Sequence, residues 1–137
     1  MDADEFKGWT AVLTGAASGM GFAAAQELAR RGANVVMCDI NATALAAKAA
    51  EVNALGGGRA IPCVTDVRKF ADAERAAALA LAETGRIDLL VPFAGGYELR
   101  MCDSYVPFYE QPIEVIDWGV QVNLMGPVYF ARACLPA

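Results

Sequence analysis

The residues best suited to binding chemistry in this 137-residue sequence are a glycine-rich run, Thr14 to Gly21, and an acid that follows it. The run stands between a short apolar segment and a segment with helical periodicity, so its backbone amides are expected at the start of a helix. Amides in that position, together with the positive end of the helix, bind a pyrophosphate, and glycines leave the backbone open to it. The acid, Asp39, stands 18 residues after Gly21, close to the spacing of about 20 at which a carboxylate accepts hydrogen bonds from the hydroxyls of an adenosine ribose.

Asp39 also bears on the choice of cofactor. Its carboxylate would repel a 2′-phosphate, and neither Ala16 nor Ile40 supplies a cation to neutralise one. We therefore expect NAD to be preferred over NADP. The alternative role for Asp39 is the N-cap of the next helix, a role that Asn41 could fill instead.

Strands that alternate with helices would bring these residues to one edge of a sheet. The apolar runs and the helical spacings predict strands at 10–14, 34–39, 60–64 and 87–93, helices at 20–31, 42–55, 71–84 and 113–135, and a surface loop at 97–112. This order predicts an α/β fold with a doubly wound, Rossmann-type parallel sheet and helices on both faces. Pro62 indicates that the third strand lies near an edge, and ligands of such sheets bind beyond the carboxyl ends of the strands.

The motif TGxxxGxG, matched by Thr14, Gly15, Gly19 and Gly21, resembles that of the short-chain dehydrogenase/reductase family. The resemblance implies that the cofactor is bound by Thr14, Gly15, Ser18, Gly19, Met20, Gly21, Asp39, Ile40, Asp66, Val67, Ala94 and Gly95. In the family, the aspartate at the place of Asp66 contacts the adenine ring, and the backbone of the next residue lies nearby. An Asx turn or a cap at the end of a strand is the alternative role for Asp66.

The segment from Val91 to Gly95 departs from the family, which usually has Asn-Asn-Ala-Gly there. Ala94 and Gly95 match, whereas Pro92 and Phe93 replace the two asparagines that normally brace the sheet through side-chain hydrogen bonds. Pro92 also lacks an N–H for the ladder between strands. We expect the change to affect the packing of the fourth strand and the floor of the nicotinamide pocket.

Asn123 resembles the asparagine of the family's catalytic Asn, Ser, Tyr, Lys tetrad. Pro127 lacks an amide proton and its ring pushes away the carbonyl of Asn123, so we expect the long helix to kink there. The freed carbonyl could hold a water, which is the role that the family assigns to it in proton relay. The alternative is a kink with an incidental asparagine.

The serine and the Tyr-x-x-x-Lys pair of that tetrad do not occur in the sequence. No lysine follows four residues after any of its tyrosines, Tyr97, Tyr105, Tyr109 and Tyr129. We therefore expect residues 1–137 to be the N-terminal part of a single NAD-binding domain, truncated after about four strands and the long helix, without its catalytic portion and inactive alone.

Composition excludes several other kinds of function. The absence of histidine removes imidazole zinc sites and the Ser-His-Asp and Cys-His catalytic layouts, and Cys38, Cys63, Cys102 and Cys134 form no CxxC pair, so we expect no metal and reduced thiols. The net charge of −5 disfavours nucleic acid and anionic membrane surfaces. The polar, acidic start and the absence of a long apolar span predict a cytoplasmic protein with no membrane helix.

The resemblance as a whole implies an NAD-dependent oxidoreductase that transfers a hydride between a nicotinamide cofactor and an alcohol or carbonyl substrate. It also implies a homo-oligomer for a complete family member. A different class of function, a non-catalytic nucleotide-binding or partner-dependent interaction module, is the alternative.

Overall fold

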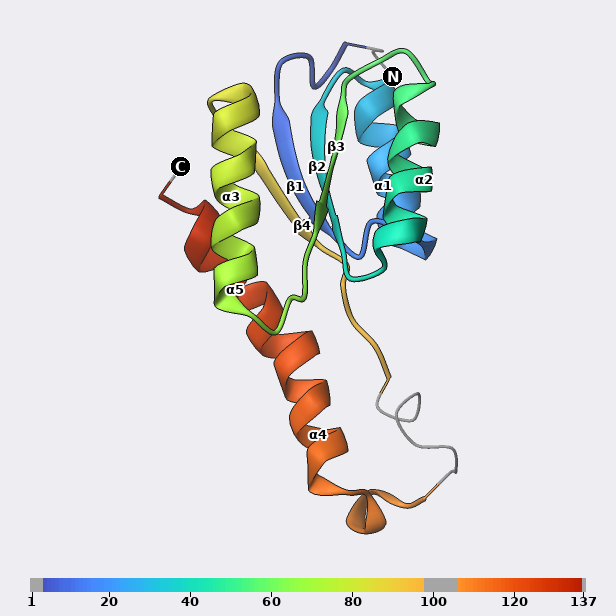
Figure 1. The fold of residues 1–137 in the computed structure, drawn as a ribbon, viewed down its shortest axis with the longest axis vertical. Helices are drawn as coiled ribbons and strands as arrows, with labels where there is room; N and C mark the ends of the chain where they lie inside the picture. Colours follow the sequence, from blue (N-terminus) through green and yellow to red (C-terminus); the bar gives the residue numbers. More distant parts are fainter. Residues whose placement is uncertain (1–3, 98–105, 137) are drawn as a thin grey trace.

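A four-stranded parallel sheet covered by helices on both faces forms the core of the molecule (Figure 1). The computed structural model describes residues 4–97 and 106–136. The strands are β1 (Thr10–Thr14), β2 (Asn34–Asp39), β3 (Ala60–Val64) and β4 (Leu89–Pro92), in the order β3-β2-β1-β4. Every neighbouring pair is parallel, as the doubly wound prediction requires. The fourth strand is shorter than the predicted 87–93.

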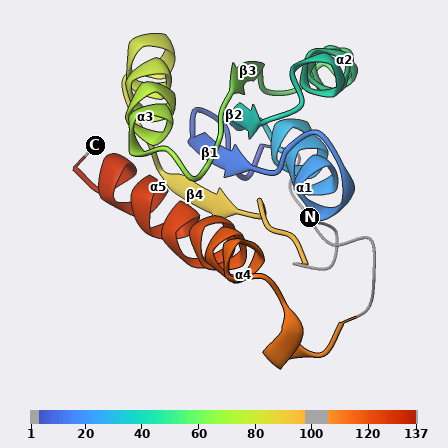
Figure 2. The same cartoon turned by 60° about the horizontal axis from the view of Figure 1, so that its bottom comes forward.

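The helices divide between the two faces of the sheet. One face carries α1 (Gly19–Arg30) and α2 (Ala42–Asn53), and the other carries α3 (Phe70–Thr84) and α5 (Gly126–Cys134) (Figure 2). The ends of the first three helices lie within two residues of the predicted ends. Among the described residues, no helix is both long and apolar enough to cross a membrane.

Alternate strand residues point into two separate apolar cores. Leu13 and Met37 pack with Leu45 on the side of α1 and α2, whereas Val36 packs with Phe130 on the side of α3 and α5, and all of these side chains are fully buried. Burial on both faces explains why the strands are continuous apolar runs without alternation. The small alanines on the inner side of α3 let that helix lie close to the sheet.

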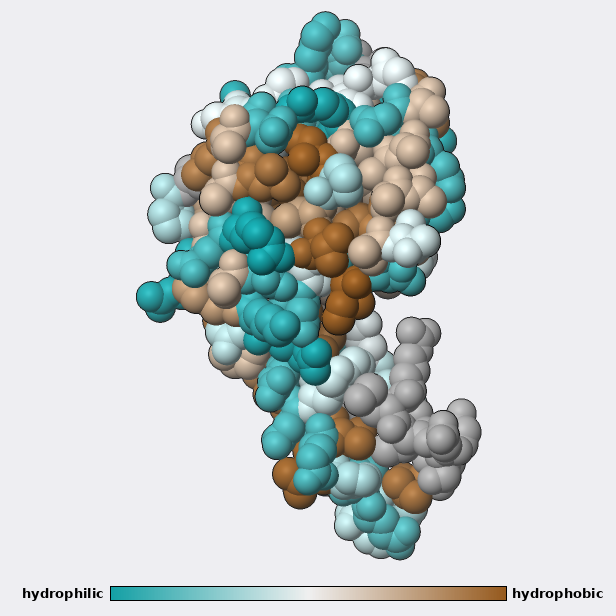
Figure 3. Space-filling view, viewed as in Figure 1, coloured by the Kyte–Doolittle hydropathy of each residue, from teal (hydrophilic) through white to brown (hydrophobic). Residues whose placement is uncertain are grey.

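β3 forms an edge of the sheet, as Pro62 predicts. Apolar surface gathers on the face of the molecule where β3 lies between α2 and α3 (Figure 3), and Val64 is half-exposed there. A proline in this strand has no N–H to offer to another chain, which protects the edge from pairing.

β4 keeps its parallel register with β1 up to the pair Thr14 and Pro92. The N–H of Phe93 donates to the carbonyl of Thr14 at 3.2 Å. The carbonyl of Thr14 therefore receives its hydrogen bond from the residue after the proline. The pairing of β1 and β4 at this end does not depend on an N–H at position 92. The N–H of Phe93 thus compensates for the donor that Pro92 lacks.

The predicted long helix is interrupted. It consists of α4 (Ile113–Val120), a π-helical turn η3 (Gln121–Met125) and α5, and a 3₁₀ turn η2 (Phe108–Glu110) precedes it. Pro127 stands in the first turn of α5, directly after the π-helical turn. The expected departure from regular α-helix thus occurs at the predicted place, because the proline has no N–H to give to the turn before it. Most of the predicted loop 97–112 lies outside the described residues.

Candidate functional site

The turn between β1 and α1 ends in an open helix N-terminus. Ser18 is the N-cap residue, but its side chain makes no capping hydrogen bond, and the first turn of α1 contains no acid. The first N–H groups of a helix have no carbonyl partner within it, and they carry the positive end of the helix dipole. Gly15 (φ 68°) and Gly19 (φ 53°) adopt the left-handed backbone conformation that the turn requires.

Close packing around this turn leaves room only for glycine at two positions. A Cβ added to Gly21 would lie 2.0 Å from the carbonyl oxygen of Gly15, and one added to Gly15 would lie 2.7 Å from the backbone nitrogen of Ala94. The Thr14 hydroxyl accepts a hydrogen bond from the same Ala94 N–H at 3.1 Å. The start of α1, the turn and the end of β4 are therefore held in direct contact.

Asp39, at the carboxyl end of β2, faces the glycine turn. Its Oδ2 accepts a hydrogen bond from the N–H of Ala17 at 3.0 Å, and its Oδ1 accepts one from the N–H of Asn41 at 3.0 Å. The N-cap of α2 is Asn41, whose side chain accepts from Ala44 N–H, so the alternative role of Asp39 as that cap is wrong. A carboxylate oxygen has two acceptor positions, so each oxygen of Asp39 retains one.

Asp66, two residues after β3, is bound on both oxygens by one arginine. Arg68 donates from Nε to Oδ1 at 2.9 Å and from Nη2 to Oδ2 at 2.7 Å, and its backbone N–H donates to Oδ1 at 3.1 Å. The Asx turn considered for Asp66 is thus present. The Arg68 guanidinium lowers the pKa of the Asp66 carboxyl below its usual value, against the effect of burial. The N–H of Asp66 donates to Asp72 Oδ2 at 2.8 Å, which fixes this loop to the start of α3.

Asn123 lies within the π-helical turn and holds the segment that follows β4. Its Oδ1 accepts from the N–H of Gly96 at 3.0 Å, and its Nδ2 donates to the carbonyl of Gly96 at 2.9 Å. The Trp118 ring lies against the same glycine, since a Cβ there would approach the ring to 2.6 Å. The side chain of Asn123 therefore positions the loop after β4.

A cavity of about 520 Å³ at the carboxyl ends of the strands joins these features. Eleven of the predicted site residues line it: Gly15, Ser18, Gly19, Met20, Gly21, Asp39, Ile40, Asp66, Val67, Ala94 and Gly95. Thr14 and Asn123 do not line it, and act on the segment after β4 instead. The volume is in the range of small-molecule and cofactor sites.

Sequence reasoning did not assign five further residues to the lining: Thr65, Arg68, Phe93, Trp118 and Val122. Trp118 and Val122 are one turn apart on the long helix, so their spacing could have placed them together. An arginine two residues after Asp66 could have suggested an ion pair. Thr65 carries no such signal, because its place in the cavity depends on the packing of β3 beside β2.

The Oγ1 hydroxyl of Thr65 is buried and has no hydrogen-bond partner in the part that the structure describes. Among the described residues, no other buried side-chain oxygen or nitrogen lacks a partner. The residue is 2% exposed and lines the cavity. A buried hydroxyl without a partner is costly, which marks this wall as a place where a ligand or a water would supply a bond. The open amides of the turn, the free acceptor positions of Asp39 and this hydroxyl together fit a dinucleotide with a pyrophosphate, a ribose and a base.

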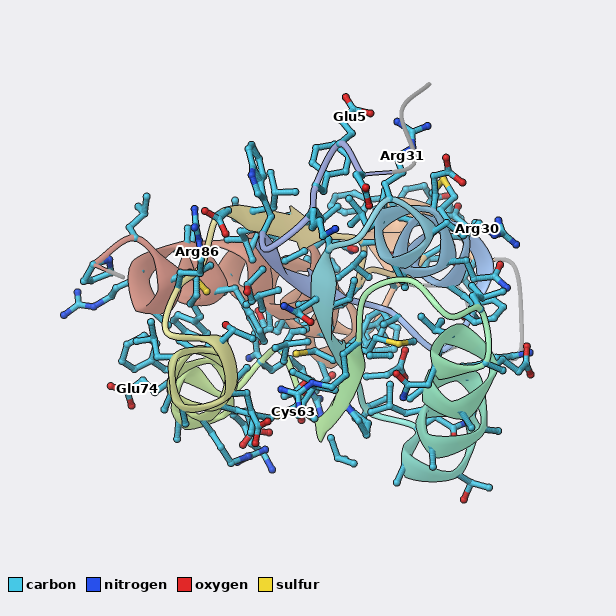
Figure 4. All side chains as sticks on the ribbon, turned by 90° about the horizontal axis from the view of Figure 1, so that it is seen from above. Glu5, Arg30, Arg31, Cys63, Glu74 and Arg86 are labelled. Carbon is cyan, nitrogen blue, oxygen red and sulfur yellow. The ribbon has the colours of Figure 1, made fainter. Side chains whose placement is uncertain are left out.

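The described cysteines lie in the core between the sheet and α3 and α5, and none of them lines the cavity. Cys38 and Cys63 stand opposite each other on β2 and β3, and Figure 4 shows Cys63 on the edge strand beside α3. Among residues 4–97 and 106–136, no group of three potential ligands could hold a metal ion. Cys38, Cys63 and Cys134 are free thiols, and Cys102 lies outside the described residues.

Comparison with known proteins gives one consistent result. A family model described as short chain dehydrogenase matches residues 9–137. The chain is 32% identical over 134 residues to a cis-2,3-dihydrobiphenyl-2,3-diol dehydrogenase of Paraburkholderia xenovorans, covering 97% of this chain and 46% of that protein. It is also 32% identical to the short chain dehydrogenase/reductase dpmpG of Macrophomina phaseolina, covering 98% of this chain and 74% of that protein.

Solved structures give the same picture. The crystal structure of a short-chain dehydrogenase/reductase from Brucella melitensis matches with a TM-score of 0.87 and 35% identity, covering all of this chain and 55% of that one. A hydroxysteroid dehydrogenase from Escherichia coli matches with a TM-score of 0.84 and 30% identity. The chain spans about half the length of these structures.

Proposed function

Because this chain belongs to the short-chain dehydrogenase family, we propose that it forms the NAD-binding part of an oxidoreductase that acts on an alcohol or a carbonyl compound. The observation that carries the proposal is the glycine turn at the open end of α1, which lies beside the Asp39 carboxylate on the wall of one cavity. Amides for a pyrophosphate and an acceptor for a ribose lie together there, as dinucleotide binding requires.

Each part of the cofactor has candidate partners on the cavity wall. The amides of Ser18, Gly19 and Met20 would bind the pyrophosphate, and the free acceptor positions of Asp39 would bind the hydroxyls of the adenosine ribose. Ile40 has an exposed side chain that would cover one side of the adenine. When bound, the nicotinamide would accept or donate the hydride.

Asp66 and Val67 are the candidate partners of the adenine base itself. The free acceptor position on Asp66 and the N–H of Val67 would meet the edge of the ring. Ala94 and Gly95 would allow the dinucleotide to approach the backbone after β4, whose position Thr14 and Asn123 fix. The main-chain carbonyl of Asn123, in the π-helical turn, would hold a water for proton relay.

Two charges in the cavity support NAD over NADP. If Asp39 binds the adenosine ribose, its carboxylate would lie next to a 2′-phosphate, and repulsion between the two groups would weaken NADP binding. Among the described residues that line the cavity, Arg68 is the one with a positive charge, and two of its nitrogens donate hydrogen bonds to Asp66. An arginine engaged in this way is less available to a phosphate.

Titration of the purified 137-residue chain with NADH tests the proposal. Trp118 lines the cavity, so energy transfer from tryptophan to the dihydronicotinamide should report binding. We expect saturable binding that is tighter for NADH than for NADPH, and a loss of both affinity and preference in Asp39→Ala. Absence of a saturable signal, or equal binding by the variant, would refute the assignment of the site.

Turnover is a separate expectation. The sequence contains no Tyr-x-x-x-Lys, and in the family this pair performs the proton transfer to or from the substrate. We expect no change in NADH absorbance with a panel of alcohols and ketones. Turnover that depends on Asn123 would show that these 137 residues are catalytically sufficient.

We also propose that a complete protein containing this chain is a homo-oligomer. α4, η3 and α5 each carry an exposed apolar side chain, those of Ile113, Leu124 and Val128. Apolar patches of this kind on helices favour association with another protein surface. Light scattering of the wild type and of Leu124→Glu would test it, with a smaller mass expected for the variant.

A further inference from the structure

Three hydrogen bonds from Arg68 hold the Asp66 carboxylate in one orientation. Two side-chain nitrogens of Arg68 reach the two oxygens, at 2.9 and 2.7 Å, and the backbone N–H of the same residue adds a third bond at 3.1 Å. The Asp66 side chain is 12% exposed and that of Arg68 is 36% exposed. A planar guanidinium with two parallel bonds fixes both the position and the rotation of a carboxylate, which a single point charge does not.

The hydrogen bonds from Arg68 determine which acceptor positions of Asp66 remain free. Oδ1 receives two donors, both from Arg68, and so has no acceptor position left. Oδ2 receives one donor, Nη2, and retains one position. The cavity wall thus offers one fixed acceptor at Asp66, beside the N–H of Val67, which makes no hydrogen bond within the described part of the chain.

We propose that Arg68 is a positioning residue for base recognition: by holding Asp66 it presents one acceptor next to the Val67 N–H, and so selects a base with an amino group over one with a carbonyl group. The Watson–Crick edge of adenine has a donor at its amino group beside an acceptor at N1, which complements this pair. Hypoxanthine has the reverse arrangement, a carbonyl oxygen beside an N–H. Its carbonyl would face the carboxylate oxygen, and both hydrogen bonds would be lost.

The inference rests on the proposed function, since it concerns the base of the same dinucleotide. Its test compares two probes, NADH and reduced nicotinamide hypoxanthine dinucleotide, which differ only in the base. We expect the wild-type chain to bind NADH roughly tenfold or more tightly than the hypoxanthine analogue, as a charge-assisted hydrogen bond to the base requires. The ratio of the two affinities isolates base recognition from every interaction that the probes share.

Two variants separate the effect of the two parallel hydrogen bonds of Arg68 from the effect of its charge. Arg68→Met removes both, so we expect the affinity ratio to fall below about threefold and both probes to bind more weakly, because the cavity becomes more negative toward the pyrophosphate. Arg68→Lys keeps the charge and loses the two parallel bonds, so the ratio should fall in the same way while the affinity for NADH falls less.

Arg86 supplies a matched control. Its Nε and Nη2 bind a carboxylate two residues away, that of Asp88, which follows Arg86 in the chain, whereas Asp66 precedes Arg68. Figure 4 shows Arg86 from the end of the sheet opposite the cavity. Arg86→Met should leave the affinity ratio unchanged. An unchanged ratio in Arg68→Lys or in a folded Arg68→Met would overturn the inference while leaving the proposed function in place. No binding of NADH by the wild type would overturn both.

Discussion

Replacement of Gly21 by alanine tests whether the contact between α1 and the glycine turn shapes the site. The added Cβ would stand 2.0 Å from the Gly15 carbonyl oxygen, whereas real Cβ atoms essentially never come within 3.0 Å of a neighbour. The turn and the helix must therefore separate by about 1 Å. This movement involves backbone on both sides, so no side-chain rotation can absorb it.

The expected loss has two parts. Overpacking of this kind costs roughly 1–3 kcal/mol of folding free energy. A displacement of about 1 Å in a binding site costs on the order of 100-fold in function, and we expect a comparable loss of affinity for NADH because the amides of the turn move with Gly15. Denaturant unfolding measures the first effect, and tryptophan fluorescence titration with NADH measures the second.

Gly56→Ala is the control, because it also replaces a glycine by alanine but at a position where the added Cβ would have no atom within 4 Å. Unlike Gly21, Gly56 has a left-handed backbone conformation (φ 75°). This substitution should cost about 1–2 kcal/mol of stability through backbone strain alone and leave NADH binding unchanged. Binding by Gly21→Ala within about threefold of the wild type, in a folded protein, would refute the reasoning.

Three further predictions concern the cavity wall, a thiol and an ion pair. Thr65→Val removes a buried hydroxyl that has no partner, so we expect a gain of about 1 kcal/mol in unfolding free energy together with weaker NADH binding; a loss of stability would contradict the first expectation. The Cys38 thiol, and then the Arg75 guanidinium, lower the pKa of Cys63 to about 7 against burial, whereas burial raises the pKa of Cys134 to about 11. Both residues are similarly buried, so peptide mass mapping after treatment with iodoacetamide at pH 7.5 should find Cys63 labelled before Cys134, and the reverse order would contradict the pKa argument. The Arg86 guanidinium lowers the pKa of Asp88, so this carboxylate stabilises the fold above the unfolded value of about 4 and loses its effect as the pH falls through the lower folded value. Asp88→Asn should therefore be less stable at pH 7 and show a shallower loss of stability below pH 4 in acid unfolding.

The sequence was sufficient to predict the fold because each element carries its own local signal. The buried strands are continuous apolar runs, α2 begins after Asn41, and Gly85 ends α3 in the left-handed conformation. The glycine turn and Asp39 were predictable for the same reason, since their spacing follows from one strand, helix and strand unit. These features depend on neighbours in the chain.

Most of the features that sequence reasoning missed depend on neighbours in space. Arg68 is the exception, because it lies two residues from Asp66 and its spacing could have suggested the ion pair. The spacing around Pro127 predicted a kink, but it did not predict the two hydrogen bonds that the Asn123 side chain makes with Gly96, across 27 residues of chain. Such contacts form only when the sheet and the long helix are both in place.

The π-helical turn fits one residue more into a turn than a regular α-helix does, and the faces of α5 depend on it. Each residue of an α-helix advances the side chains by about 100°, so conversion of Gln121–Met125 to regular α-helix without loss of a residue would rotate α5 by roughly that angle relative to α4. Phe130, now fully buried, would then leave its place in the core. Substitutions that favour regular α-helix in this short segment should therefore destabilise the packing of the whole helix that follows it.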